Sequence, residues 1–200
     1  MKIYREAVES DLSAICALGE EVNAVHHRAF PDVFASVGEI DRDAAHWMNS
    51  IGKEHATTFV AEESGSLVGF VNVSVVTESH SLLQPMRFGR VGSVGITEHK
   101  RGQGIGRELM ELAQDWVARR GGVELRLNVW AFNAHALHVY EELGYEVRSL
   151  FLVKRLSSVR PNPSLERTST GLVLGPRTGQ CHHPLRGPST NPVVSAQLKR

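Results

Sequence analysis

The chain has 200 residues, of which 42% are apolar, and its 22 Lys and Arg residues balance its 22 Asp and Glu residues. This length and apolar content suffice for one domain with a hydrophobic core, and no run approaches the ~18 apolar residues of a transmembrane helix. Two isolated cysteines are too few for a disulfide framework, and the first residues contain no apolar stretch of signal-peptide length, so we expect a soluble, cytoplasmic protein without membrane partners.

The charges are distributed unevenly. Residues 157–200 hold six basic residues and one acidic residue, a net of +5, which leaves 16 basic and 21 acidic residues, a net of −5, in residues 1–156. The C-terminal segment also holds six of the eight prolines and no aromatic residue. Such a segment buries too little apolar surface to offset the entropy of ordering, so we expect a folded domain over 1–156 and a disordered, basic, proline-rich tail. Without aromatics the tail does not indicate nucleic-acid binding, and Cys181 with two histidines lacks further metal ligands.

Strand and helix patterns alternate along the domain. Apolar residues at β spacing predict strands over 2–8, 57–62, 67–76, 88–96 and 123–129, and a last strand or hairpin over 145–156. Helical spacing predicts helices that begin near residue 11, over 41–51, from 105 to the glycine pair at 121–122, and over 133–143. The Glu-Ser-Gly-Ser link after the second strand indicates a hairpin. The order β-α-α-β-β-β-α-β-α-β is typical of the α/β class, here an α+β mixed sheet with helices on both faces.

The most informative stretch joins the strand that ends at Ile96 to the helix that begins at Ile105. Its sequence, Thr-Glu-His-Lys-Arg-Gly-Gln-Gly, is basic and rich in glycine. The first N–H groups of a helix have no intrahelical acceptor, the helix dipole is positive there, and glycines let a phosphate approach the backbone. These features predict a site for a phosphate-bearing ligand, where Arg101 and Arg107 add charge.

Other phosphate-binding motifs fit this stretch less well. A dinucleotide fold needs G-x-G-x-x-G tight against its strand and an acidic residue about 20 positions later. Here four residues separate Ile96 from Arg101, and Glu124 opens the next predicted strand instead of ending it. A Walker loop is excluded because no Gly-Lys-Ser/Thr follows. A nicotinamide or flavin nucleotide binder remains an alternative.

Two motifs resemble those of a known family. Arg-x-x-Gly-x-Gly at 101–106 resembles the acyl-CoA pyrophosphate loop of the GNAT superfamily of N-acetyltransferases, and Asn-x-x-Ala-x-x-x-Tyr-Glu-x-x-Gly-Tyr at 133–145 resembles its second signature. The resemblance covers about residues 1–156 and implies a GNAT-like fold, in which a central mixed β-sheet splays between strands 4 and 5. It implies acetyl-CoA as co-substrate, no metal, and direct attack by a primary amine of a small molecule or peptide. A homodimer is also implied by this family analogy.

The resemblance assigns roles to individual residues. Ile96 N–H would stabilise the oxyanion of the tetrahedral intermediate, and the phenol of Tyr140 would give a proton to the departing thiolate. Two alternatives stay open: Asn133 is equally suited to cap its helix, and the glycines at 92 and 95 to form a bulge instead of admitting a ligand. Contacts with acetyl-CoA are implied at Val94, Gly95, Ile96, Arg101, Gly102, Gln103, Gly104, Ile105, Gly106, Arg107 and Asn133.

The acceptor site and the catalytic base are less defined. Some members of the resembled family carry glutamate on the strand before the loop, where this chain has Arg90, which cannot act as a base. A non-catalytic acyl-CoA-binding sensor is therefore a second alternative. The acidic balance of 1–156 favours a cationic acceptor. The candidate bases, besides a water chain, are Glu78, His80, Glu21, His26 and His27. The expected acceptor contacts are His27, Phe30, Phe34 and Glu78.

Overall fold

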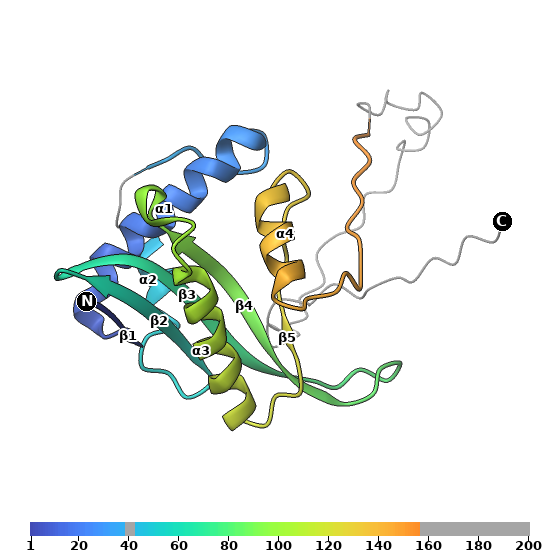
Figure 1. Cartoon of the computed structure of the whole chain (residues 1–200). Helices are drawn as coiled ribbons and strands as arrows, with labels where there is room; N and C mark the ends of the chain where they lie inside the picture. The colour runs from blue at the N-terminus through green and yellow to red at the C-terminus, as the bar shows by residue number, and fades with distance from the viewer. Residues whose placement is uncertain (39–42, 157–200) are drawn as a thin grey trace, which may run out of the picture. The chain divides into compact units, whose positions relative to one another are not determined.

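Figure 1 shows the computed structural model of the chain, which describes residues 1–38 and 43–156. Residues Met1–Ser149 form one compact unit, and the chain from Leu150 belongs to a second. The predicted tail, with its cysteine and histidines, and the start of the predicted 41–51 helix lie outside the described residues. In the part of the chain that is described, no helix is long and apolar enough to cross a membrane.

The elements of the first unit largely follow the predicted order. In sequence they are β1 (Lys2–Glu6), η1 (Glu9–Asp11), α1 (Leu12–Ala29), α2 (Ala44–Met48), β2 (Ala56–Glu63), β3 (Ser66–Glu78), β4 (Met86–Ile96), η3 (Glu98–Lys100), α3 (Ile105–Arg119), β5 (Leu125–Arg126) and α4 (Ala134–Glu142). The sheet has five strands in the order β1-β2-β3-β4-β5. The first four are antiparallel neighbours, and β5 runs parallel to β4, which confirms the predicted mixed sheet.

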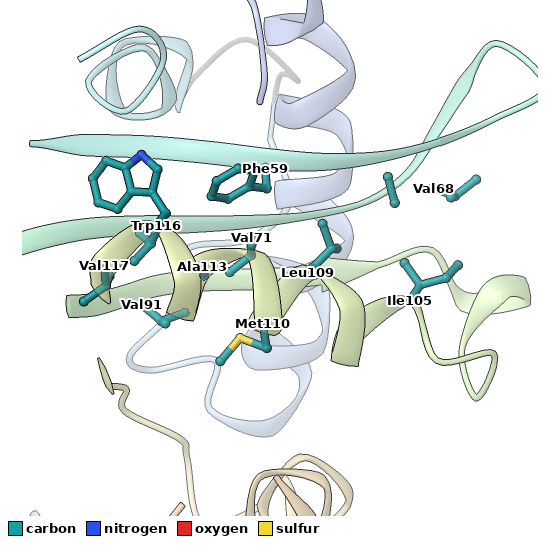
Figure 2. Packing of buried hydrophobic residues seen from close by; sticks show 12 residues of the cluster. Phe59, Val68, Val71, Val91, Ile105, Leu109, Met110, Ala113, Trp116 and Val117 are labelled. Carbon is teal, nitrogen blue, oxygen red and sulfur yellow. The ribbon is translucent and has the colours of Figure 1, made fainter. Parts of the chain in front are cut away.

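Helices cover both faces of the sheet because strand side chains alternate between the two faces. One face packs beneath α3, as Figure 2 shows, where Leu109 and Trp116 are almost fully buried. The other face, with Val60 and Phe70, packs against α1 and α2. Cys16 lies in this second cluster at 1% exposure, as its apolar helix position predicts. The prediction of helices on both faces is confirmed.

Two predicted strands are wrong in extent. The strand predicted over 123–129 is reduced to Leu125–Arg126, and no strand forms over 145–156. β5 pairs with β4 only at Gly89 and Arg90. Residues with high β propensity form a strand only where a neighbouring strand supplies hydrogen bonds. Among the described residues no strand pairs with 145–156.

An ion-pair network ties η1 to the edge of the sheet. The Arg5 guanidinium donates to both carboxylate oxygens of Asp11, at 2.7 and 2.9 Å, and to Glu62 at 3.0 Å. Asp11 also accepts from the N–H of Val8 at 2.8 Å. The hydrogen bonds from Arg5 hold the pKa of the Asp11 carboxyl below its usual range, and the bond from Val8 adds to this effect.

We predict that Asp11→Asn destabilises the domain near neutral pH but not in strong acid. Because the folded-state pKa is lowered, the carboxylate stabilises the fold at pH values above its unfolded pKa, and this contribution is lost as the pH falls through the folded pKa. The substitution should cost about 1–2 kcal/mol at pH 7, since it removes a charged hydrogen-bond acceptor from a partly exposed pair. Urea unfolding of both proteins between pH 7 and the acid transition measures the difference. A loss that is independent of pH would contradict this account.

Candidate active site

The loop between β4 and α3 carries backbone N–H groups without acceptors. Residues 101–104 are exposed, and Gly102 and Gly104 have φ of 73° and 79°, in the left-handed region that favours glycine. The first α-helical bond runs from Glu108 N–H to the Gly104 carbonyl at 3.2 Å, and no side chain caps the helix. Within residues 1–38 and 43–156, no carbonyl or side chain accepts from the N–H groups of 103–107. The start of α3 therefore presents a set of unused donors.

The surroundings of these donors are open. A Cβ added at Gly102 or Gly104 would meet no atom within 4 Å, and one at Gly106 only Ile96 Cγ1 at 4.0 Å. By contrast, a Cβ at Gly89 would lie 2.4 Å from Val117 Cγ2. The loop glycines are thus not required for internal packing. Unused donors beside open space fit a diphosphate.

Basic side chains surround the loop. Lys2 Nζ donates to Gln103 Oε1 at 3.2 Å, and Arg101 Nε donates to the Ile96 carbonyl at 3.0 Å. Lys100 forms an ion pair with Glu63. Arg107 is exposed on the first turn of α3, and no carboxylate of the described chain lies within salt-bridge distance of it. The charge near the loop therefore favours an anion.

Strand β4 contains a β-bulge. Ser93 pairs with Asn72 and Val91 pairs with Val73, so Gly92 is the extra residue between the two pairs. A Cβ at Gly92 would lie 2.6 Å from Asn72 Oδ1, which gives glycine a packing reason at this position. The bulge, one of the two sequence-based alternatives for this glycine, is confirmed.

The bulge decides which amides of β4 face β5. Before it, Gly89 N–H donates at 2.9 Å to the carbonyl that precedes β5; after it, Thr97 N–H donates at 3.0 Å to Val68 on the opposite neighbour, β3. Because the direction alternates along a strand, the N–H groups of Val94 and Ile96 point away from β3. β5 pairs with β4 only at its two residues, so these donors lie along an unpaired stretch. We call this edge of β4, residues 91–96 on the side away from β3, the gap.

Helix α4 carries the second predicted motif. Asn133 Oδ1 accepts from Ala136 N–H at 3.2 Å, so Asn133 caps its own helix. Tyr140 packs against the core beneath α3, as do Val94 and Ile96 of β4. A phenol is protonated at neutral pH, and burial raises the pKa of Tyr140 further. Burial, with a smaller effect of Tyr140, raises the pKa of Tyr145 to about 12.

An aromatic cluster joins the end of α1 to the loop between β5 and α4. The Phe30 ring lies 5.5 Å from Trp130 and 5.6 Å from Phe132, and Phe34 lies 4.9 Å from Trp130. The His26 ring lies 4.9 Å from Phe34 and 5.5 Å from Phe132. Trp130 and Phe132 are not among the sequence-based candidates; the signal that could have selected them is their position directly before the Asn133 motif.

Comparison with known proteins decides the family. The sequence model of the acetyltransferase (GNAT) family matches residues 20–145, which include the bulge, the loop and α4. This chain belongs to the GNAT family. The prediction from the two motifs is thereby confirmed.

Relatives of this GNAT chain include a streptothricin acetyltransferase and mycothiol acetyltransferases. It is 34% identical over 119 residues to a streptothricin acetyltransferase of Streptomyces lavendulae, an alignment that spans 59% of this chain and 56% of that protein. It is 36% identical over 87 residues to a mycothiol acetyltransferase of Amycolatopsis mediterranei, which spans 44% of this chain and 29% of the relative. The chain thus aligns with about half or less of these two relatives.

Solved structures share the GNAT fold. A mutant of the BH1408 protein from Bacillus halodurans superposes with a TM-score of 0.73 at 22% identity, over 78% of this chain and 99% of that chain. Aminoglycoside N-acetyltransferase AAC(6')-Iy in complex with CoA superposes with a TM-score of 0.58 at 19% identity, over 78% and 96% of the two chains. At these identities the likeness shows the fold.

Some predicted residues of this GNAT chain lie away from the others. His27 is close to the aromatic cluster, with Nδ1 2.8 Å from the Phe34 carbonyl. Glu78 lies at the far end of β3, where its carboxylate forms an ion pair with Arg126 at 3.0 Å. The structure therefore does not bring Glu78 together with the other expected acceptor residues. Arg90 is exposed, and the described residues contain no group of His, Cys, Asp and Glu arranged to hold a metal ion.

Proposed function

We propose that this GNAT protein transfers an acetyl group from acetyl-CoA to a primary amine of a small molecule or peptide. One observation supports this most: the strand whose Val94 and Ile96 N–H groups point away from β3 is followed directly by the loop and helix start whose N–H groups at 103–107 have no acceptor among the described residues. A diphosphate fits the first set. A thioester carbonyl fits the second, where a fixed N–H stabilises the oxyanion of the tetrahedral intermediate.

Direct attack of the amine on the thioester needs no acyl-enzyme. Cys16 is the only cysteine of the described chain, and at 1% exposure it is sealed in the core between α1 and the sheet. The thiolate that departs requires a proton. A phenol is protonated at neutral pH, and Tyr140 packs against the same core cluster as Val94 and Ile96, so we assign it as the proton donor.

The proposed acceptor is a cationic amine. Residues 1–156 carry a net charge of −5, which favours the approach of a cation. The half-exposed rings of Phe30 and Trp130 offer aromatic faces, which attract ammonium groups and cover apolar parts of a ligand. The names of the relatives, which include streptothricin and aminoglycoside acetyltransferases, point in the same direction.

A transfer assay tests the proposed function. Acetyl-CoA is incubated with the protein and with streptothricin, neamine, spermidine or an alanine-initiated tripeptide, and release of the CoA thiol is followed. We expect turnover with at least one amine, and acetylated product by mass spectrometry. Binding of acetyl-CoA without turnover on any amine would favour the sensor alternative. Thermal stabilisation by NAD(P) but not by CoA would overturn the cofactor.

We predict that Tyr140→Phe slows turnover without weakening cofactor binding. A thiolate is a tolerable leaving group, so loss of the proton donor should lower kcat by about 10²-fold or less, the low end for general acid catalysis. The KM for acetyl-CoA should stay within about twofold, because the ring and its packing remain. Tyr145→Phe, at the neighbouring buried tyrosine, is the control and should keep the wild-type kcat. Equal kcat for wild type and Tyr140→Phe would remove the assigned role.

A further inference from the structure

We propose that His26 accepts the proton of the acceptor amine. This inference rests on the proposed acetyl transfer and names the base that the sequence leaves open. Three observations support it. His26 lies close to the gap on the α1 face of the sheet, a hydrogen bond fixes the tautomer of its ring, and the competing side chains have other contacts or positions.

The path of α1 across the sheet places His26 at the gap. Val22 lies against β4, since a Cβ at Gly95 would be 3.0 Å from Val22 Cγ2. His26 is one turn further along the same helix face, about 6 Å along the axis. Over this turn α1 reaches the segment after β5, because the His26 ring lies 5.5 Å from Phe132. Beside Gly95, β4 has no partner on β5, which pairs only with Gly89 and Arg90.

The contacts of the His26 ring with residues outside α1 support this position. The ring of His26 packs against Phe132, which belongs to the loop that leaves β5, at 5.5 Å. It also packs against Phe34 at 4.9 Å. Helix α1 therefore approaches β4 through Val22 and the segment after β5 through His26. Tyr140 packs on the opposite face, beneath α3. Proton acceptor and proton donor thus flank the gap from its two sides.

The backbone fixes which nitrogen of His26 is basic. Nδ1 lies 2.8 Å from the carbonyl oxygen of Val22. A carbonyl only accepts, so Nδ1 carries the hydrogen and Nε2 of the neutral ring holds the lone pair. Nε2 has no hydrogen-bond partner in residues 1–38 and 43–156, and no charged side chain there forms an ion pair with the ring. The two rings that pack against the His26 ring, those of Phe34 and Phe132, are uncharged.

The competing bases have other contacts or positions. Glu78 forms its ion pair with Arg126 at the paired end of β4 and β5. Glu21 accepts from Thr97 Oγ1 at 3.5 Å and lines a hollow of about 660 Å³ together with Arg5, Leu67 and Thr97, so its carboxylate already has a hydrogen-bond donor. His27 follows His26 by one position, so its side chain leaves the helix about 100° away from that of His26. Its Nδ1 lies 2.8 Å from the carbonyl oxygen of Phe34, after the end of α1.

The proposed step balances atoms and charge. The ammonium gives one proton to Nε2, and the neutral amine nitrogen attacks the thioester carbon, so that an N–C bond forms and the carbonyl electron pair moves to oxygen. Collapse of this intermediate breaks the C–S bond, and the sulfur leaves with the bonding pair. The phenol of Tyr140 protonates the thiolate and regains a proton from the former amine nitrogen. His26 then releases its proton to water, and the products are an amide, the CoA thiol and one proton.

The test uses His26→Asn in the full-length protein with the amine that wild type acetylates fastest among streptothricin, neamine, spermidine and the tripeptide. The Asn amide can still donate toward the Val22 carbonyl but cannot accept a proton. We expect kcat to fall by about 10²- to 10⁴-fold. The KM for acetyl-CoA and the melting temperature should stay near the wild-type values. His55→Asn, the same substitution at a 64% exposed histidine before β2, should keep wild-type turnover.

A second variant separates chemistry from structure. His26→Ala leaves a hole the size of the ring, so added imidazole should restore part of its turnover. Equal kcat for wild type and His26→Asn overturns the proposal while wild-type acetylation leaves the proposed function standing. A loss that imidazole does not restore, or that is accompanied by a parallel rise in the acetyl-CoA KM, marks a structural role and also overturns it. So does a loss of kcat in His27→Asn that exceeds the loss in His26→Asn.

Discussion

Gly104→Val is expected to weaken acetyl-CoA binding by about 100-fold. A φ of 79° is unfavourable for a β-branched residue, so valine shifts the first N–H groups of α3 or places a methyl group where the phosphate approaches. Each charge-assisted hydrogen bond that is lost costs about 1.5–3 kcal/mol, or more than tenfold in affinity. Isothermal titration with acetyl-CoA and with CoA measures the loss.

Gly52→Val is the matched control for this variant. Gly52 also has a left-handed φ, 64°, and a Cβ there would likewise meet no atom within 4 Å, but it lies between α2 and β2. Both variants should lose about 1–3 kcal/mol of stability to backbone strain. Only Gly104→Val should lose affinity. Unchanged acetyl-CoA binding by a folded Gly104→Val protein would show that the diphosphate lies elsewhere.

Ile105→Ala is expected to reduce both stability and cofactor affinity. Ile105 is 1% exposed at the first residue of α3, and its Cγ2 would be 3.3 Å from a Cβ at Gly69 on β3. Loss of this side chain leaves a cavity and should cost about 2–5 kcal/mol. The same side chain anchors the helix end that carries the unused N–H groups, so we also expect the acetyl-CoA dissociation constant to rise by about tenfold, from misplaced donors.

Leu109→Ala separates the two effects. Leu109 lies one turn along the same helix, is fully buried and belongs to the same cluster as Ile105. It should lose a comparable free energy of unfolding, measured by urea denaturation, and keep its acetyl-CoA affinity when binding is measured well below the melting temperature. Equal losses of affinity in both variants would mean that the affinity follows global stability instead of the position of the loop.

Local patterns predicted the elements whose partners lie nearby or whose periodicity is long. Helix α3 shows its apolar face through Ile105, Leu109 and Trp116, and the hairpin shows its turn through Gly65, so both appear where expected. Helix α1 begins within one residue of its prediction. In each case a single stretch of sequence contains the interactions that define the element.

Features that depend on distant partners were not predictable in this way. The strand over 123–129 is cut to two residues because β4 pairs with so little of it, and 145–156 lacks a strand partner among the described residues. Trp130 reaches Phe30 across 100 positions of sequence. Glycine at position 92 indicated a bulge, but its effect on the direction of the later amides depends on the register with β3, which no local pattern contains.

The bulge at Gly92 limits how this strand can change in evolution. Substitutions of Val91, Ser93, Val94 and Ile96 other than to proline leave the donors of the gap in place, whereas a Cβ at Gly92 or Gly95 would lie 2.6 Å from Asn72 or 2.5 Å from Phe70. Deletion of one residue would exchange the two edges of the strand from that point on, so that the amides of Val94 and Ile96 would turn toward β3. Insertion or deletion of two residues leaves each later amide facing the same side of the strand. Homologous strands should therefore tolerate length changes of even number far better than changes of one.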